Sequence, residues 1–140
     1  MNLFFVLDAS ILVARLVSQD EFHVAVRTWM SERRAVGTQF VSPSLILTEV
    51  AGAVSRRTGS PSLGRKALAA LRRFPGLRIV EMSNFLVLEA ASLAADLGLR
   101  SADSIYVAIA KQLDLPLVTL DSEQRERGRK VISVHDSLDA

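Results

Sequence analysis

The amino-acid sequence predicts an α/β fold in three layers, with a central, mainly parallel sheet of five strands flanked by helices. Short apolar runs alternate along the chain with longer stretches of helical apolar spacing, a pattern typical of parallel strands joined by helices. The 140 residues suit one core, and 49% of them are hydrophobic, which is enough to build it. We therefore expect a single domain over residues 1–140.

Five short apolar runs are the candidate strands. The first, from Leu3 to Leu7, ends at Asp8 and has the continuous apolar character of a buried strand. The others are expected at Phe40 and Val41 and over residues 77–82, 117–120 and 131–134. These runs are too short for a signal peptide or a membrane span, so we expect neither.

Start and stop signals for helices lie between these runs. Ser-Pro pairs at 42–43 and 60–61 predict two helices that reach about Arg57 and Phe74. Asp20 and Ser101 are the expected N-caps of two further helices. The remaining helices are expected over residues 10–17, over residues 83–98 and near Glu123.

Cysteine usage and charge limit the classes of function. The chain has no cysteine, which excludes disulfides and thiolate zinc sites and fits a cytoplasmic protein. Its 17 basic and 15 acidic residues give a net charge of +2. If several acids gather in one pocket, the rest of the surface is basic, which suits a polyanionic substrate; a merely solubilising surface is the alternative.

Three aspartates stand where a parallel sheet binds ligands. Asp8 follows the first predicted strand and Asp121 follows the fourth, and ligands bind at the carboxyl ends of such strands. Asp103 lies in the first turn of a predicted helix, where backbone N–H groups favour an anion. Taken singly, Asp8 and Asp121 are equally well explained as helix caps or turn formers, and Asp103 is better explained as an acid that stabilises a helix start.

Glu49 is harder to explain as surface charge. It lies in the middle of a predicted helix, and its neighbours at helical spacing are apolar, including Ile46 and Val50. A buried carboxylate without a partner costs several kcal/mol or takes up a proton. A cation or an arginine partner would remove that cost.

Four such carboxylates in contact would need a cation or would be partly protonated. Each pair repels by about 4 kcal/mol at an effective dielectric constant of about 20. All-oxygen ligands favour hard ions such as Mg²⁺ or Mn²⁺. His23 and His135 have no partners at metal-ligand spacing, and we expect both to be structural or surface residues.

The segments around the acids carry recognisable motifs. VLDASILVA places Ser10 two positions after Asp8, SPSLILTEVAGAV carries Glu49, and ADSIYVAIAKQLDLPLVTLD joins Asp103 to Asp121. Together they resemble the motifs of PIN domains, and specifically of the VapC toxins of bacterial and archaeal toxin–antitoxin pairs. The resemblance covers essentially the whole chain. Ser104 departs from the alanine common in this family, but it is small enough for the same helix packing.

The resemblance implies a PIN-like fold and a metal-dependent endoribonuclease that hydrolyses RNA phosphodiester bonds. It implies Mg²⁺ or Mn²⁺ bound by the four acids, with Ser10 and Thr119 orienting carboxylates or water. Glu123 is a candidate further ligand, and the number of ions stays open. These ligands and catalytic residues are Asp8, Glu49, Asp103 and Asp121.

The resemblance also implies an RNA substrate, a cognate antitoxin and a homodimer. The antitoxin is expected to present an arginine to the acids. An apolar excess supports the dimer unless one core holds all of it: Phe22, Trp29, Leu63, Leu68 and Leu71. Candidate phosphate contacts, each equally explained as solvated charge, are Arg56, Arg57, Arg72, Arg73, Arg125 and Arg127.

Two rival functions are compatible with parts of this pattern. The first is a non-catalytic or RNA-processing PIN-like module that binds RNA or protein, although such modules usually lose one or more of the acids. The second is an aspartyl-phosphate enzyme or receiver. A phosphatase of that kind would need an aspartate two residues after Asp8, where Ser10 stands.

Overall fold

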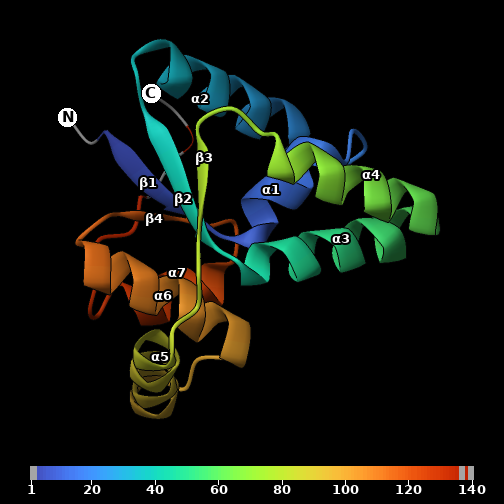
Figure 1. Ribbon diagram of the computed structural model, residues 1–140. Helices are drawn as coiled ribbons and strands as arrows, with labels where there is room; N and C mark the ends of the chain where they lie inside the picture. The colour runs from blue at the N-terminus through green and yellow to red at the C-terminus, as the bar shows by residue number, and fades with distance from the viewer. Residues whose placement is uncertain (1–2, 136–137, 139–140) are drawn as a thin grey trace.

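Four parallel strands form the central sheet of the computed structural model, which describes residues 3–135 and 138. The strands are β1 (Phe4–Leu7), β2 (Gln39–Pro43), β3 (Leu77–Val80) and β4 (Leu117–Val118). Their order is β3-β2-β1-β4 (Figure 1). Both β2 and β4 pair with β1, so the strand order reverses there and the carboxyl ends of β1 and β4 are neighbours.

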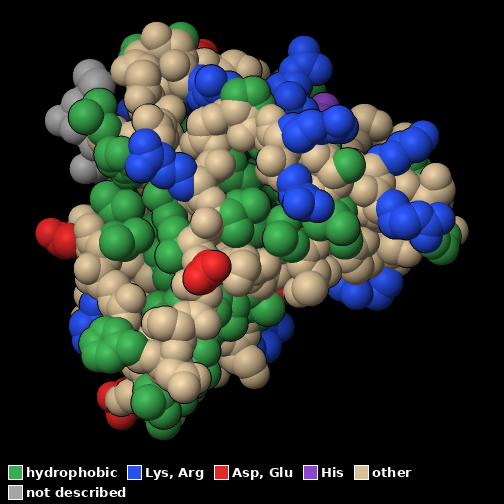
Figure 2. All heavy atoms as spheres, viewed as in Figure 1, with side chains coloured by type: hydrophobic (Ala, Val, Ile, Leu, Met, Phe, Trp, Pro, Cys, Tyr) green, Lys and Arg blue, Asp and Glu red, His purple; other side chains and the backbone are tan. Residues whose placement is uncertain are grey.

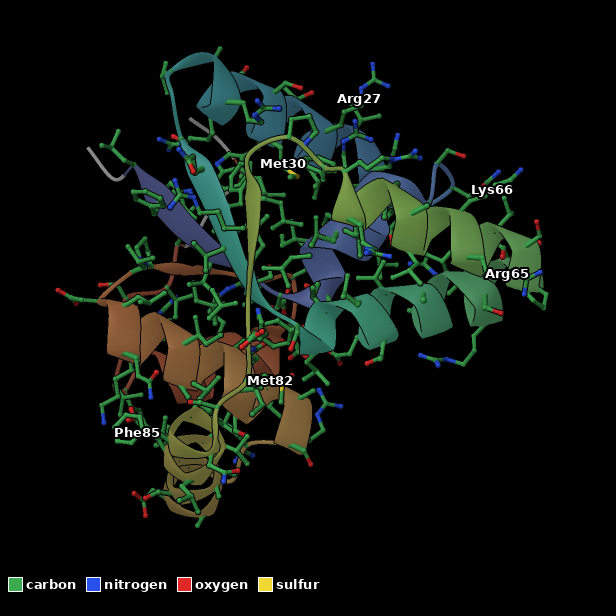
Figure 3. All side chains as sticks on the ribbon, in the orientation of Figure 1. Arg27, Met30, Arg65, Lys66, Met82 and Phe85 are labelled. Carbon is green, nitrogen blue, oxygen red and sulfur yellow. The ribbon has the colours of Figure 1, made fainter. Side chains whose placement is uncertain are left out.

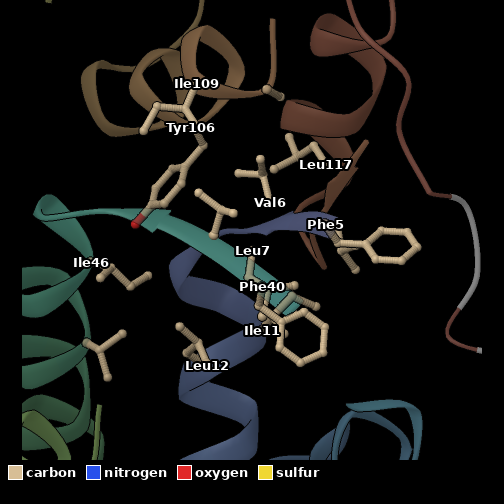
Figure 4. Close-up of a cluster of buried hydrophobic side chains, with 14 of the residues drawn as sticks. Phe5, Val6, Leu7, Ile11, Leu12, Phe40, Ile46, Tyr106, Ile109 and Leu117 are labelled. Atoms are coloured by element: carbon tan, nitrogen blue, oxygen red, sulfur yellow. The ribbon is translucent and has the colours of Figure 1, made fainter. Parts of the chain in front are cut away.

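Helices cover both sides of this sheet. The described residues form α1 (Ala9–Leu16), α2 (His23–Ala35), α3 (Leu45–Thr58), α4 (Pro61–Arg72), α5 (Asn84–Leu97), α6 (Ser101–Leu113) and α7 (Ser122–Gly128). Helix α6 packs against the sheet with α5 beside it, α1 lies on the other side, and the α3–α4 pair projects outward (Figures 1 and 4). None of these helices has the length and apolar character needed to cross a membrane. The predicted α/β architecture is confirmed.

The core lies between the sheet and the helices on either side (Figure 4). Val6 and Leu7 of β1, Leu12 of α1 and Phe40 of β2 are all 0% exposed. Both faces of β1 are therefore buried, as its continuous apolar run predicts. In α6, every residue from 104 to 110 is buried, because the sheet and α5 pack around that helix.

The predicted fifth strand, residues 131–134, is wrong for the described part of the chain. Only Val134 pairs with the sheet, through an isolated parallel bridge to Leu117. The backbone N–H groups of Val131 and Ile132 donate instead to the carbonyl of Gly128, at 3.0 Å each. The turn after α7 thus uses the donors that a strand would need.

One predicted helix start is displaced by one residue. Ser101, expected as an N-cap, is the first residue of α6, and Arg100 is the N-cap.

Two further predicted helix starts also differ from the structure. Pro43 is the last residue of β2 rather than the first of a helix, because the Ser42 hydroxyl donates to the Leu7 carbonyl at 2.7 Å and holds this segment against β1. Helix α3 begins only at Leu45. Asp20 accepts the backbone N–H of Phe22 at 2.8 Å, just before α2, so it closes a turn instead of capping that helix.

The five residues taken as an apolar excess divide between core and surface. Trp29 and Leu71 are each 1% exposed and belong to the core. Leu68 is partly buried. Phe22 and Leu63 remain on the surface, with 41% and 43% exposed. One small core therefore holds part of the set, and the apolar argument for a dimer is reduced to two residues.

We predict opposite effects on stability from alanine at two helix glycines. In α4, a Cβ at Gly64 would lie 2.7 Å from the Ala51 carbonyl oxygen and 3.0 Å from the Ser55 Cβ. Gly64→Ala should therefore push α3 and α4 apart and lower the free energy of unfolding by about 1–3 kcal/mol. Chemical denaturation measures this change.

Gly52→Ala in α3 is the matched control. Its Cβ would meet only the end of the flexible Arg56 side chain, at 3.0 Å. This substitution should raise the free energy of unfolding by about 0.5–1 kcal/mol through helix propensity. Equal effects at the two positions would contradict the proposed close contact of α3 with α4.

Candidate active site

Asp8 lies at the centre of the candidate site, directly after β1. It is the N-cap of α1, and its Oδ1 accepts the backbone N–H of Ile11 at 3.4 Å and the hydroxyl of Ser10 at 2.5 Å. Its Oδ2 accepts the Thr119 hydroxyl at 2.5 Å. One carboxylate thus ties the end of β1 to the segment that follows β4.

Burial makes this carboxylate costly to ionise. Asp8 is only 4% exposed, and loss of solvation raises its pKa to about 6. The hydrogen bonds from Ser10 and Thr119 lower the pKa but do not offset burial, and the charge of Asp103 raises it further. A cation beside Asp8 would relieve this cost.

Hydroxyl groups replace the sheet ladder beyond β4. The Ser10 hydroxyl accepts the backbone N–H of Leu120 at 2.9 Å, and the Thr119 hydroxyl accepts that of Asp121 at 3.0 Å. Strand β4 therefore ends at Val118, two residues earlier than predicted. Asp121 then caps α7, with its Oδ1 accepting the backbone N–H of Gln124 at 3.0 Å.

Asp103 and Asp121 share one arginine. The Nε of Arg100 donates to Oδ2 of Asp103 at 3.3 Å, and its Nη2 donates to Oδ2 of Asp121 at 2.8 Å. Burial nevertheless raises the pKa of Asp103, with Arg100 opposing the shift and the charge of Asp121 adding to it. The arginine therefore compensates only part of the cost of holding these charges together.

Glu49 reaches the site from α3 and is held by a tyrosine. The Tyr106 hydroxyl donates to Oε1 of Glu49 at 2.5 Å. Figure 4 shows the Tyr106 ring extending from α6 toward the end of β2 and the start of α3. Burial raises the pKa of Glu49, the Tyr106 hydrogen bond lowers it and the charge of Asp103 raises it. The prediction that Glu49 points toward the core side agrees with this position.

Electrostatic interactions connect the four acids through Asp103. The charge of Asp103 raises the pKa of Asp8 and of Glu49, and the charge of Asp121 raises the pKa of Asp103. Within residues 3–135 and 138, no three Asp, Glu or His side chains are grouped closely enough to hold an ion as they stand. The donor set fits Mg²⁺ or Mn²⁺ in its chemistry, because it is all oxygen, is short of positive charge and includes three desolvated acids, Asp8, Glu49 and Asp103.

Two of the six candidate arginines line a cavity that adjoins the acids. This cavity, of about 620 Å³, is bordered by Ser10 and Glu49 on one side and by Phe22, Arg56 and Arg57 on the other. Arg57 is paired with Asp20 at 2.6 Å. Arg72 and Arg73 are exposed at the end of α4 and do not line this cavity.

The two arginines of α7 make structural contacts. Arg125 donates to the Thr119 carbonyl at 2.9 Å, and Arg127 donates to the Leu97 carbonyl at 2.9 Å. Arg127 also pairs with Glu123 at 3.1 Å, and the Glu123 side chain is 56% exposed. The Glu123 side chain therefore faces its own helix and solvent. Among the four acids, its charge acts weakly on Asp103, whose pKa it raises.

Both histidines occupy structural positions. A ring nitrogen of His23, Nδ1, lies 2.8 Å from the Ala14 carbonyl, which joins α2 to α1. The His135 ring packs at 5.3 Å from Phe5 and at 5.6 Å from Trp29, measured between ring centroids. These contacts agree with the prediction that both histidines are structural or surface residues.

Sequence reasoning missed three residues of the site: Arg100, Tyr106 and Gln124. Arg100, Asp103 and Tyr106 follow one another at intervals of three, so helical spacing could have placed all three on one side of α6. Gln124 is 0% exposed and donates through Nε2 to the Asp103 carbonyl at 3.3 Å. No local signal distinguishes it from a surface glutamine in a charged segment.

Comparisons with known proteins agree with the fold described above. A family model described as PIN domain matches residues 5–130. No curated protein sequence matches the chain significantly. The solved structure of VapC20 from Mycobacterium tuberculosis, a sarcin–ricin loop cleaving toxin, has a TM-score of 0.76 and 16% identity, covering 89% of this chain and 95% of that chain.

Two further solved structures are also similar. FitAcB from Neisseria gonorrhoeae gives a TM-score of 0.68 at 18% identity, covering 94% of this chain and 96% of that chain. VapBC2 from Rickettsia felis, bound to a DNA fragment from its promoter, gives 0.68 at 17% identity, covering 93% and 96% respectively. At these identities the likeness is one of fold.

We predict that Asp8→Asn changes how the stability of the metal-free protein depends on pH. The pKa of Asp8 is about 6 in the folded chain against 3.8 as the ordinary value, so the folded state holds a proton that the unfolded state has lost. The protonated Asp8 carboxyl therefore contributes stability to the folded state below about pH 4, and this stability is lost as pH rises through about 6. Relative to wild type, Asp8→Asn should gain on the order of 3 kcal/mol between pH 4 and 7.

Asp20→Asn is a control of opposite sign. Burial raises the pKa of Asp20, but hydrogen bonds from Arg57 and from the Phe22 backbone outweigh it and lower the pKa overall. This variant should lose stability relative to wild type as pH rises toward 3.8, the ordinary pKa of aspartate, and the loss should stay constant above it. Urea denaturation in EDTA from about pH 3 to about pH 7 measures both effects, and parallel curves for wild type and Asp8→Asn would contradict the first prediction.

Proposed function

Because the chain belongs to the PIN-domain family, we propose that it is a metal-dependent endoribonuclease and the toxin of a VapBC-type toxin–antitoxin system. One observation carries the proposal: four acids from separate elements, three of them desolvated, interact around Asp103 at the carboxyl ends of β1 and β4. Their burial leaves a deficit of positive charge. A divalent cation would fill this deficit and could at the same time bind an RNA phosphate.

The proposed roles of the side chains follow from their contacts. Asp8, Glu49, Asp103 and Asp121 would hold Mg²⁺ or Mn²⁺, which supplies Lewis-acid chemistry for phosphodiester hydrolysis when bound. Ser10 and Thr119 fix the Asp8 carboxylate from both sides, so its remaining lone pairs have a defined direction. Tyr106 does the same for Glu49.

The RNA strand has a route to this site along the cavity lined by α1 and α3. Arg56 and Arg57 offer positive charge there, and Phe22 offers an aromatic face that is 41% exposed. Phosphate contacts with arginine and stacking of unpaired bases on aromatic rings are the usual means of binding single-stranded RNA. Arg56 is the better candidate of the two, since Arg57 already pairs with Asp20.

A cognate antitoxin is the proposed partner. A solved structure from Klebsiella pneumoniae is a toxin–antitoxin complex, and this chain shares its fold. The partner would place a basic residue, best an arginine, against the acids, where a bidentate contact replaces the cation. In this chain Arg100 already pairs with two of the acids, so Asp8 and Glu49 are the remaining targets.

We also propose that the toxin acts in the cytoplasm as a homodimer. The most exposed apolar side chains of α5 are Phe85 and Leu88, each 71% exposed, and Figure 2 shows apolar surface over this lower part of the molecule. Such surface commonly lies in an interface. Light scattering at micromolar concentration tests the oligomeric state.

We predict that each of Asp8→Asn, Glu49→Gln, Asp103→Asn and Asp121→Asn lowers RNA cleavage by at least about 100-fold, because each removes a charge from one shared site. Cleavage should require Mg²⁺ or Mn²⁺, and Ca²⁺, with its looser geometry, should not support it. Sequencing of new RNA ends after metal addition measures both effects.

The control for charge is Glu126→Gln, an exposed change in α7 outside the site. It should cleave like wild type. Full activity in any of the four acid variants would remove that residue from the site. Absence of cleavage under all conditions, with RNA still bound, would instead favour the non-catalytic RNA-binding module.

We predict that Arg56→Gln weakens RNA binding more than Arg72→Gln. Both residues are exposed arginines on helices, but only Arg56 lines the cavity beside the acids. In an Asp103→Asn background that cannot cleave, Arg56→Gln should lower affinity roughly three- to tenfold and reduce the salt dependence by about one phosphate contact. Equal losses for both variants in a binding titration would place the RNA elsewhere.

A further inference from the structure

Arg100 is an arginine in an unfavourable place for a positive charge. It occupies the N-cap of α6, with φ −69° and ψ 158°, at the end where the helix dipole and free N–H groups favour anions. Its ion pairs with Asp103 and Asp121 oppose this repulsion. Within the described residues, these two acids are therefore what holds its guanidinium over the site.

Arg100 occupies carboxylate oxygen atoms that a metal held by these acids could use. It takes Oδ2 of Asp103 and Oδ2 of Asp121, whereas Oδ1 of Asp121 is used to cap α7. The guanidinium thus bridges two acids that come from different elements. In this arrangement, no three acidic side chains of the described residues lie close enough together to hold one metal ion.

Arg100 can leave without disturbing the core. Its side chain is 68% exposed, while those of Asp103 and Asp121 are 17% and 29% exposed. The arginine therefore covers the acids from the solvent side. Exposed ion pairs of this kind are individually weak, so a divalent cation can compete with them.

We propose that Arg100 is a resident counter-ion that the divalent metal must displace from Asp103 and Asp121, and that it thereby sets the metal affinity of the site. This rests on the proposed function, because it takes the four acids as the metal ligands. The metal-free toxin then keeps its acids paired, and metal binding exchanges one cation for another. Arg100 acts on metal binding as a positioning residue and competitor.

Arg100→Gln tests the competition directly. Titration calorimetry with Mn²⁺ alone, at low salt and neutral pH, should give a dissociation constant roughly three- to tenfold lower than for wild type, since two exposed ion pairs no longer oppose the ion. The rise in Tm at a fixed Mn²⁺ concentration should increase in parallel. Neither readout depends on cleavage.

Two further variants separate pairing from net charge. Arg65→Gln removes the same charge from the outer end of α4, distant from α6 (Figure 3), and should leave the Mn²⁺ dissociation constant unchanged. Arg100→Lys keeps the charge but loses the planar guanidinium that reaches both acids. Its Mn²⁺ dissociation constant should lie between those of wild type and Arg100→Gln. The lysine variant also decides the matter if Arg100→Gln fails to fold.

The outcomes distinguish this inference from the proposed function. If wild type binds Mn²⁺ and Arg100→Gln binds it equally or more weakly, Arg100 is not a competitor, while the metal site stands. If Arg65→Gln tightens binding as much as Arg100→Gln, the effect is one of net charge and the inference is overturned. If neither wild type nor variant binds Mn²⁺, both the inference and the metal-dependent function fail.

Discussion

The desolvated carboxylate of Asp8 is the constraint on which the rest of the site depends. It lies at the end of β1, where both faces of the strand are buried, so its oxygens must find partners within the protein. They find them in Ser10 and the start of α1 on one side and in Thr119 on the other. The same contacts join the carboxyl ends of β1 and β4, which makes the geometry of the site part of the fold.

Helix α6 supplies much of the electrostatic balance around that carboxylate. It contributes an acid, Asp103, a cation, Arg100, and a hydroxyl donor, Tyr106, which reaches across to Glu49. Because α6 is buried along the middle of its length, these groups have fixed positions relative to the sheet. Burial still raises the pKa of Asp8, Glu49 and Asp103, so the balance remains short of positive charge.

Predictions from sequence succeeded where the signal is local. The Ser60–Pro61 pair correctly marks the start of α4, and the run ending at Leu7 correctly marks β1. They failed where tertiary contacts decide. Residues 131–134 have the composition of a strand, but the turn after α7 uses their donors. The position of Arg100 in the site depends on its contact with Asp121, which is 21 positions away in the sequence.

Two of the proposed ligands are also the N-caps of helices, so the same side chains serve both the fold and the proposed chemistry. Asp8 caps α1 and Asp121 caps α7. A descendant that lost nuclease activity would still need oxygen acceptors at both positions, so drift should favour asparagine or serine there over alanine. Glu49 caps nothing, and its replacement would only need to accept the Tyr106 hydroxyl. The pattern of replacement among inactive descendants should therefore differ between the capping acids and the acid of α3.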